Sequence, residues 1–141
     1  MDINRRNRLL ELIKTKGTPE GQAPGPTVSL EDFFEGNDDQ GSIGCNLFLH
    51  PGISKFYKTL AEIKSRSDVQ DVLVEIRDLV DEQSWPFSDS VFVLTSMSAE
   101  SLRKLMSKVK PDEVGQFPAG STPKDLPPLE TGMQILGAWW D

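Results

Sequence analysis

The sequence contains little of what catalytic and metal sites are usually built from. It has one cysteine, Cys45, and one histidine, His50, among 141 residues. A single cysteine excludes a disulfide within the chain, and the pair is too few for a zinc site made of cysteine and histidine. On an extended strand these two side chains would point to opposite faces about 16 Å apart, too far for a nucleophile and its base. We therefore predict a buried, inert Cys45 and no metal site.

Long hydrophobic runs are also missing. The longest, residues 91–94, is far shorter than the roughly 20 residues that span a bilayer. The first residues lack the apolar stretch of a signal peptide. These absences predict a soluble, cytoplasmic protein that does not contact a membrane.

Motifs for nucleotide binding and hydrolysis are absent as well. There is no glycine-rich phosphate loop, no Gly-x-Ser-x-Gly and no His-Glu-x-x-His. The acidic turn over residues 36–41 resembles a calcium loop in composition, but an EF-hand counted from Asn37 would need glycine at Ser42 and glutamate at Phe48. The sequence thus predicts no catalytic residue and no cofactor, although an enzyme that uses carboxylates with Asn46 or His50 stays an alternative.

Acidic residues outnumber basic ones by 22 to 15, which gives a net charge of −7. This charge repels phosphate backbones, so nucleic acid is not an expected partner. Residues 68–89 contain seven carboxylates and one basic residue, Arg77. This acidic sector is either a solvated face or a surface that attracts a basic partner.

The first 42 residues are predicted to form an N-terminal unit outside the main sheet. Apolar spacing predicts a helix over residues 3–16, capped by Asp2 and ended by Gly17. Three prolines and two glycines make residues 18–26 a linker. Ser29 then caps a short helical turn before the acidic loop. The first helix packs either on its own domain or on a second copy of the protein.

Residues 43–141 are predicted to form an α+β core domain. Hydrophobic patterns predict strands over residues 43–49, 72–77, 91–95 and 133–140. One helix is expected after residues 50–52 and another after Ser98. The order β-α-β-β-α-β, with right-handed crossovers, predicts a ferredoxin-like sandwich. Its four-stranded antiparallel sheet would have helices on one face and the other face open.

Two aromatic segments are candidates for partner contact. Trp85 and Phe87 flank a proline next to Asp89, and they must either cap the core or stand exposed. Trp139 and Trp140 are adjacent on the last predicted strand, so one should face the core and the other should face outwards. We predict a contact surface made of Trp85, Phe87, Asp89, Trp139 and Trp140.

These features favour a non-enzymatic protein-interaction or regulatory module that binds a protein partner or forms a homodimer. Two other classes stay open. One is a regulatory domain that senses a small molecule of unknown identity. The other is an acidic inhibitor, of the immunity type, that binds a basic partner. The predicted fold does not choose among them, because such folds host many unrelated functions.

Overall fold

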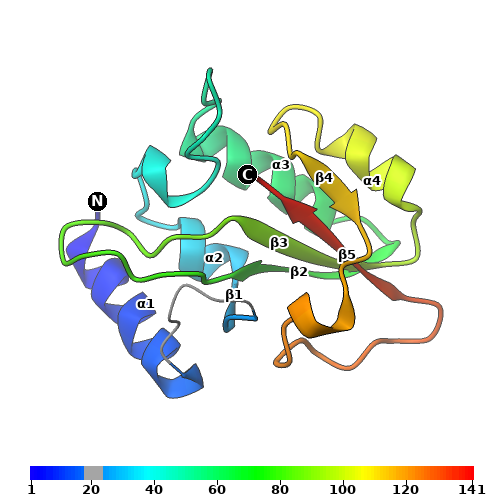
Figure 1. Ribbon diagram of the computed structural model, residues 1–141, viewed down its shortest axis with the longest axis horizontal. Helices are drawn as coiled ribbons and strands as arrows, with labels where there is room; N and C mark the ends of the chain where they lie inside the picture. Colours follow the sequence, from blue (N-terminus) through cyan, green and yellow to red (C-terminus); the bar gives the residue numbers. More distant parts are fainter. Residues whose placement is uncertain (18–23) are drawn as a thin grey trace.

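The computed structural model describes residues 1–17 and 24–141 and contains one five-stranded antiparallel sheet with helices. The strand order is β1-β2-β3-β5-β4 (Figure 1). The fold is therefore α+β, as predicted. In chain order the elements are α1 (Ile3–Lys16), β1 (Thr27–Ser29), α2 (Leu30–Phe34), the 3₁₀ turn η1 (Gln40–Ser42), α3 (Ile53–Lys64), β2 (Val69–Glu75), β3 (Ser90–Thr95), α4 (Ala99–Leu105), β4 (Glu113–Gly115), the 3₁₀ turn η2 (Ala119–Ser121) and β5 (Gln134–Trp139).

Three helices begin at the side-chain caps that the sequence predicts. Asp2, Ser29 and Ser98 each accept a hydrogen bond from the backbone N–H three residues later. Gly17 ends α1, with a φ of 105° that favours glycine. The predicted linker over residues 18–26 lies mostly outside the described residues.

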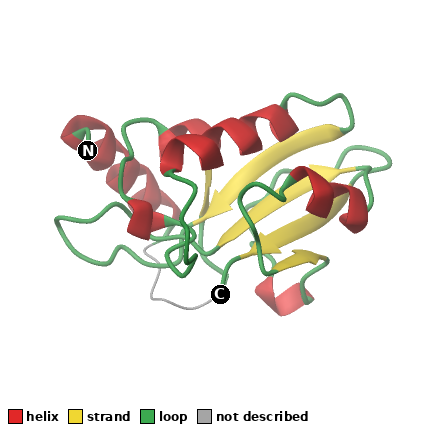
Figure 2. Ribbon diagram, turned by 90° about the horizontal axis from the view of Figure 1, so that it is seen from above, coloured by secondary structure: helices red, strands yellow, loops and turns green. Residues whose placement is uncertain are grey.

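The core lies between the sheet and the helices α3 and α4, which run along one side of it (Figure 2). Adjacent strands β2, β3 and β5 pair in register, so that Val72, Val93 and Leu136 face the same way. The predicted antiparallel pairing of these strands is confirmed, and so is the more complete burial predicted for the strand at residues 91–95. Leu9 of α1 and Phe33 of α2 belong to the same cluster of buried side chains.

The four-stranded ferredoxin-like arrangement is not confirmed, because residues 43–49 form a loop and not a strand. Gly44 has a φ of 66°, and the N–H of Leu47 donates to its carbonyl at 3.0 Å, so the chain turns here. The alternating apolar residues of this segment do not share one buried face, since Leu49 is 68% exposed. The edge of the sheet next to β2 is formed by the three-residue strand β1, which the sequence did not predict.

The second face of the sheet is not open, which corrects another prediction. Phe92 and Leu94 of β3 point to this face and are fully buried. The ring of Phe117 packs edge-on against Phe92, with centroids 5.3 Å apart. Further along the same segment, Asp125 accepts hydrogen bonds from the backbone and the hydroxyl of Thr27. The stretch from β4 to β5 therefore crosses this face, because apolar residues on both sides of β3 require cover.

Candidate functional site

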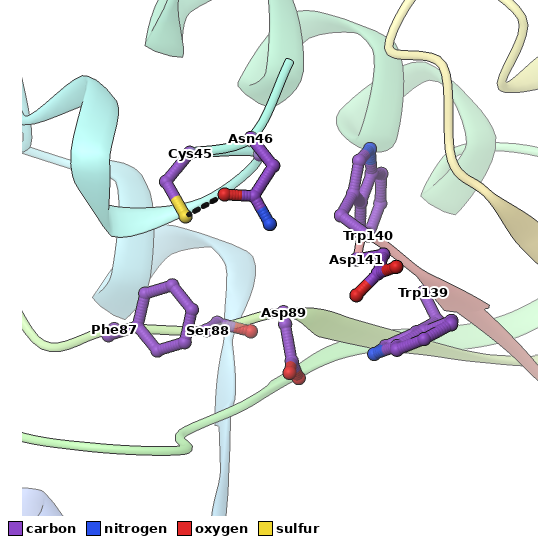
Figure 3. Close-up of a pocket in the computed structure, with 9 residues that line it drawn as sticks. Cys45, Asn46, Phe87, Ser88, Asp89, Trp139, Trp140 and Asp141 are labelled. Carbon is purple, nitrogen blue, oxygen red and sulfur yellow. Dashed lines mark hydrogen bonds between the residues drawn. The ribbon is translucent and has the colours of Figure 1, made fainter.

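Three short segments that are far apart in the sequence enclose a hollow of about 200 Å³. They are residues 44–46 after η1, residues 87–89 before β3, and residues 139–141 at the end of β5 (Figure 3). A hydrogen bond joins two of these segments: the N–H of Trp140 donates to the Asp89 carbonyl at 2.9 Å. We call this feature the Trp139 hollow.

Four of the five predicted contact residues line the Trp139 hollow. Phe87 and Asp89 lie on one wall, and Trp139 and Trp140 lie on another (Figure 3). Trp139 is half-buried, whereas Trp140 is 3% exposed and donates its indole N–H to the Val109 carbonyl at 2.7 Å. The adjacent tryptophans therefore divide between surface and core, as predicted from strand geometry.

Trp85, the fifth predicted contact residue, is elsewhere. Its side chain is fully buried in the core, and its backbone N–H donates to the Asp39 carboxylate at 3.1 Å. Of the two alternatives that the sequence left open for this residue, the structure shows the core cap. A partner cannot reach this indole, so we do not include Trp85 in the site.

The acidic loop after α2 uses its polar side chains internally. Asp39 accepts hydrogen bonds from the N–H groups of Gly41 and Trp85 through its two carboxylate oxygens. Asn37 is buried, and its amide donates to the Ser42 hydroxyl at 3.0 Å. These bonds close the loop against the β2–β3 connection, and they give its asparagine and aspartate a structural role.

A charge network holds Asp89, one of the residues that line the hollow. Arg77 donates from Nη2 to the carboxylates of Asp89, at 3.0 Å, and Glu75, at 3.2 Å. Glu75 is 1% exposed and also accepts from the Gly25 N–H at 2.8 Å. Burial raises the pKa of Glu75, and the Gly25 and Arg77 contacts oppose that shift. The network fixes Asp89 at the edge of the Trp139 hollow.

The Trp139 hollow is acidic and aromatic. Its lining residues include two aspartates, Asp89 and Asp141, and no lysine, arginine or histidine of the described chain. Asp112 adds a third carboxylate next to them, since it accepts from the Asp141 N–H at 2.6 Å. Within the described residues, Oδ2 of Asp89 receives no hydrogen bond, because Arg77 and the Ser90 hydroxyl both donate to Oδ1. Such a hollow suits a positively charged group.

Cys45 is exposed, which corrects the prediction of a buried thiol. It lies in the loop after Gly44, where its S–H donates to the Asn46 side chain at 3.6 Å (Figure 3). His50 is not available to this thiol as a base. Its Nδ1 accepts from the Gly52 N–H at 2.9 Å, so its Nε2 carries the proton and donates to the Ile43 carbonyl at 2.8 Å.

Sequence reasoning missed the loop part of this region. Cys45 and Asn46 line the Trp139 hollow, and beyond them Phe48 is 97% exposed and Leu49 is 68% exposed. The pattern of apolar residues concealed the loop by resembling a strand. The two glycines at positions 41 and 44 were the signal for a turn.

The negative charge of the acidic sector over residues 68–89 is partly neutralised by ion pairs. Four of its seven carboxylates are paired with basic residues: Asp68 with Arg66, Asp71 with Lys64, and both Glu75 and Asp89 with Arg77. Asp89 is the one carboxylate of this sector that lines the Trp139 hollow.

In the part of the chain that the structure describes, none of the helices has the length and apolar character needed to cross a membrane.

Comparison with known proteins places the chain in a family. The model of a family described as "Uncharacterized protein YfbO family" matches residues 4–138. A protein of Escherichia coli (strain K12), described as "Uncharacterized protein YfbO", is 34% identical over 136 residues, which cover 95% of this chain and 96% of that protein. No solved structure matches. The chain belongs to the YfbO family.

Proposed function

We propose that this protein is a non-enzymatic interaction module that binds a partner protein through the Trp139 hollow. The observation that carries the proposal is the convergence of Phe87, Asp89, Trp139 and Trp140 on one small depression. Trp is enriched among residues that dominate binding energy at protein interfaces. A half-buried Trp139 next to carboxylates combines an apolar contact with an electrostatic one.

The size of the hollow favours a side chain over a metabolite. Ligand sites for small molecules usually measure roughly 300–1,000 Å³ and enclose most of the ligand. The Trp139 hollow measures about 200 Å³ and its charged groups are two aspartates. One arginine or lysine side chain from a partner fits this volume and chemistry better than a cofactor does.

Site-specific photo-crosslinking tests the proposal. Benzoylphenylalanine replaces Phe87, which is half-buried at the hollow, and in a matched control it replaces Lys58, which is exposed on α3. Irradiation of cells that produce each protein should give a discrete adduct from position 87 and not from position 58. Trp139→Ala should reduce the yield of the position-87 adduct. The same adducts from both positions, or none from position 87, would contradict the proposal.

A further inference from the structure

Two adjacent apolar side chains project into water beside the Trp139 hollow. Phe48 is 97% exposed and Leu49 is 68% exposed, on the loop that rises from the molecule before α3 (Figure 1). Single exposed apolar residues are common on protein surfaces, whereas a contiguous exposed patch is a mark of interaction sites. We call these two residues the apolar tip.

The loop that carries the apolar tip is fixed at both ends. At one end, Gly44 turns the chain and packs against the buried ring of Phe56. At the other end, the ring of His50 bridges the Ile43 carbonyl and the Gly52 N–H, and it lies 5.3 Å from the Phe56 ring. The tip is thus presented in a set position, which lowers the entropy lost when a partner binds it.

The apolar tip and the Trp139 hollow belong to one surface. A second, shallower depression of about 410 Å³ is lined by residues 40–41, 45 and 47–50. Cys45 lines both this depression and the Trp139 hollow. The two depressions are therefore neighbours, and a partner large enough to cover both of them would contact the tip.

Charge decides what kind of partner fits this surface. A second copy of the chain would bring two molecules of charge −7 together, with Asp89 and Asp141 on both sides. An anionic lipid surface would be repelled for the same reason. A basic protein is attracted, and its cationic side chain would meet Asp141 together with Asp89, which already pairs with Arg77.

We propose that the partner is a basic protein that inserts an arginine or lysine side chain between Asp89 and Asp141 and receives the apolar tip in an apolar depression of its own. This inference rests on the proposed function and deepens it, because it names the chemistry of the partner and the second half of the interface. The cation contacts the face of Trp139, and Phe48 and Leu49 exclude water from the adjoining contact.

The cation half of the proposal can be tested without the natural partner. N-acetyl-arginine methylamide serves as the probe, and its citrulline analogue is the neutral control of the same shape. The arginine probe should shift the indole N–H resonance of Trp139 in two-dimensional NMR spectra, and the citrulline probe should not. Asp141→Asn should weaken arginine binding roughly threefold, as expected for loss of one exposed ion pair. Glu62→Gln, which changes an exposed carboxylate on α3, should not. Equal shifts with both probes, or equal losses in both variants, would overturn this half.

The tip is tested on the crosslinked adduct of the position-87 protein. Phe48→Ser and Leu49→Ser should each lower the adduct yield, whereas Leu129→Ser, which changes an exposed leucine elsewhere, should leave it unchanged. In cell extract, raising the salt from about 50 to 200 mM should lower the yield roughly fivefold, because exposed charges are screened. The captured protein should be basic.

The two proposals fail in different ways. Absence of any adduct from position 87 removes the proposed function and this inference together. An adduct that is insensitive to salt and to both serine variants leaves the proposed function in place and overturns the inference. An adduct with a second copy of the chain, or with an acidic protein, has the same meaning. Urea unfolding of each variant confirms that it is folded.

Discussion

Gly44→Ala should destabilise the protein strongly, because this glycine connects the loop over residues 43–49 to the core. Its φ of 66° lies in the left-handed region. A Cβ at this position would lie 2.7 Å from Cζ of Phe56 and 3.1 Å from Cδ1 of Leu47. Phe56 is fully buried and its ring lies 5.4 Å from the ring of Trp140, so it has little room to move away.

The expected cost of Gly44→Ala has two parts. An L residue in the left-handed conformation costs about 1–2 kcal/mol. An added methyl group in a filled core costs about 1–3 kcal/mol through displaced side chains. Together they predict a loss of about 2–5 kcal/mol in the free energy of unfolding, which is a large fraction of the roughly 5–15 kcal/mol that is usual for a domain.

Urea unfolding followed by tryptophan fluorescence measures this loss. Gly120→Ala is the matched control, because Gly120 has open space around its Cβ position and no positive φ, so its effect should stay within about 0.5 kcal/mol. Combining Gly44→Ala with Phe56→Leu should recover about 1 kcal/mol relative to additivity, since the shorter side chain no longer reaches the new methyl group. If Gly44→Ala costs no more than Gly120→Ala, the proposed steric link between loop and core is wrong.

Three further substitutions test the polar interior. Burial raises the pKa of Glu75 above its ordinary value of 4.5, so the folded state binds this proton more tightly and the stability from this group falls as pH rises through and above that value. The free energy of unfolding of the wild type relative to Glu75→Gln should therefore decline as pH rises above the ordinary value of 4.5. Arg6→Met should cost about 2–3 kcal/mol and speed amide hydrogen exchange in residues 78–87, because the buried Arg6 guanidinium donates to two backbone carbonyls of the β2–β3 connection. Trp140→Phe should cost about 1–3 kcal/mol in urea unfolding, since it leaves the buried Val109 carbonyl without its indole donor.

The elements with local signals were predicted well from the sequence. Side-chain caps at Asp2, Ser29 and Ser98 place the starts of three helices, because a cap acts within one helical turn. The strands β2 and β3 were predicted from side-chain alternation and β-branched residues, and both are long enough for the pattern to be distinctive. In each case the information lies in a short window of neighbouring residues.

Features that depend on distant contacts were not predicted. β1 and β4 have three residues each, so neither can show a periodic pattern, and both exist because a longer neighbour offers free hydrogen-bonding groups. The loop over residues 43–49 alternates like a strand, but the turn at Gly44 decides its conformation. The cover on the second face depends on Phe117, which lies in a segment without periodicity.

The site was predictable only in part, because only some of its geometry is set by neighbouring residues. Trp139 and Trp140 were assigned opposite sides from strand geometry, which is local. That Asp89 and Phe87 lie next to them follows from the pairing of β3 with β5, in which Ser90 is opposite Trp139. The contribution of Cys45 and Asn46 depends on how the loop folds against α3, and no local pattern contains that information.

The energetic role of Phe48 separates it from the buried aromatic residues. A side chain that is 97% exposed in the folded protein buries almost no area on folding, so it gains almost none of the roughly 1.5–3 kcal/mol that a buried phenylalanine contributes. The bonds of His50 and the turn at Gly44, which is seated on the buried ring of Phe56, stabilise the loop irrespective of which side chain occupies its tip. Folding therefore gives no reason for a phenylalanine and a leucine at positions 48 and 49, whereas the partner contact that we propose does.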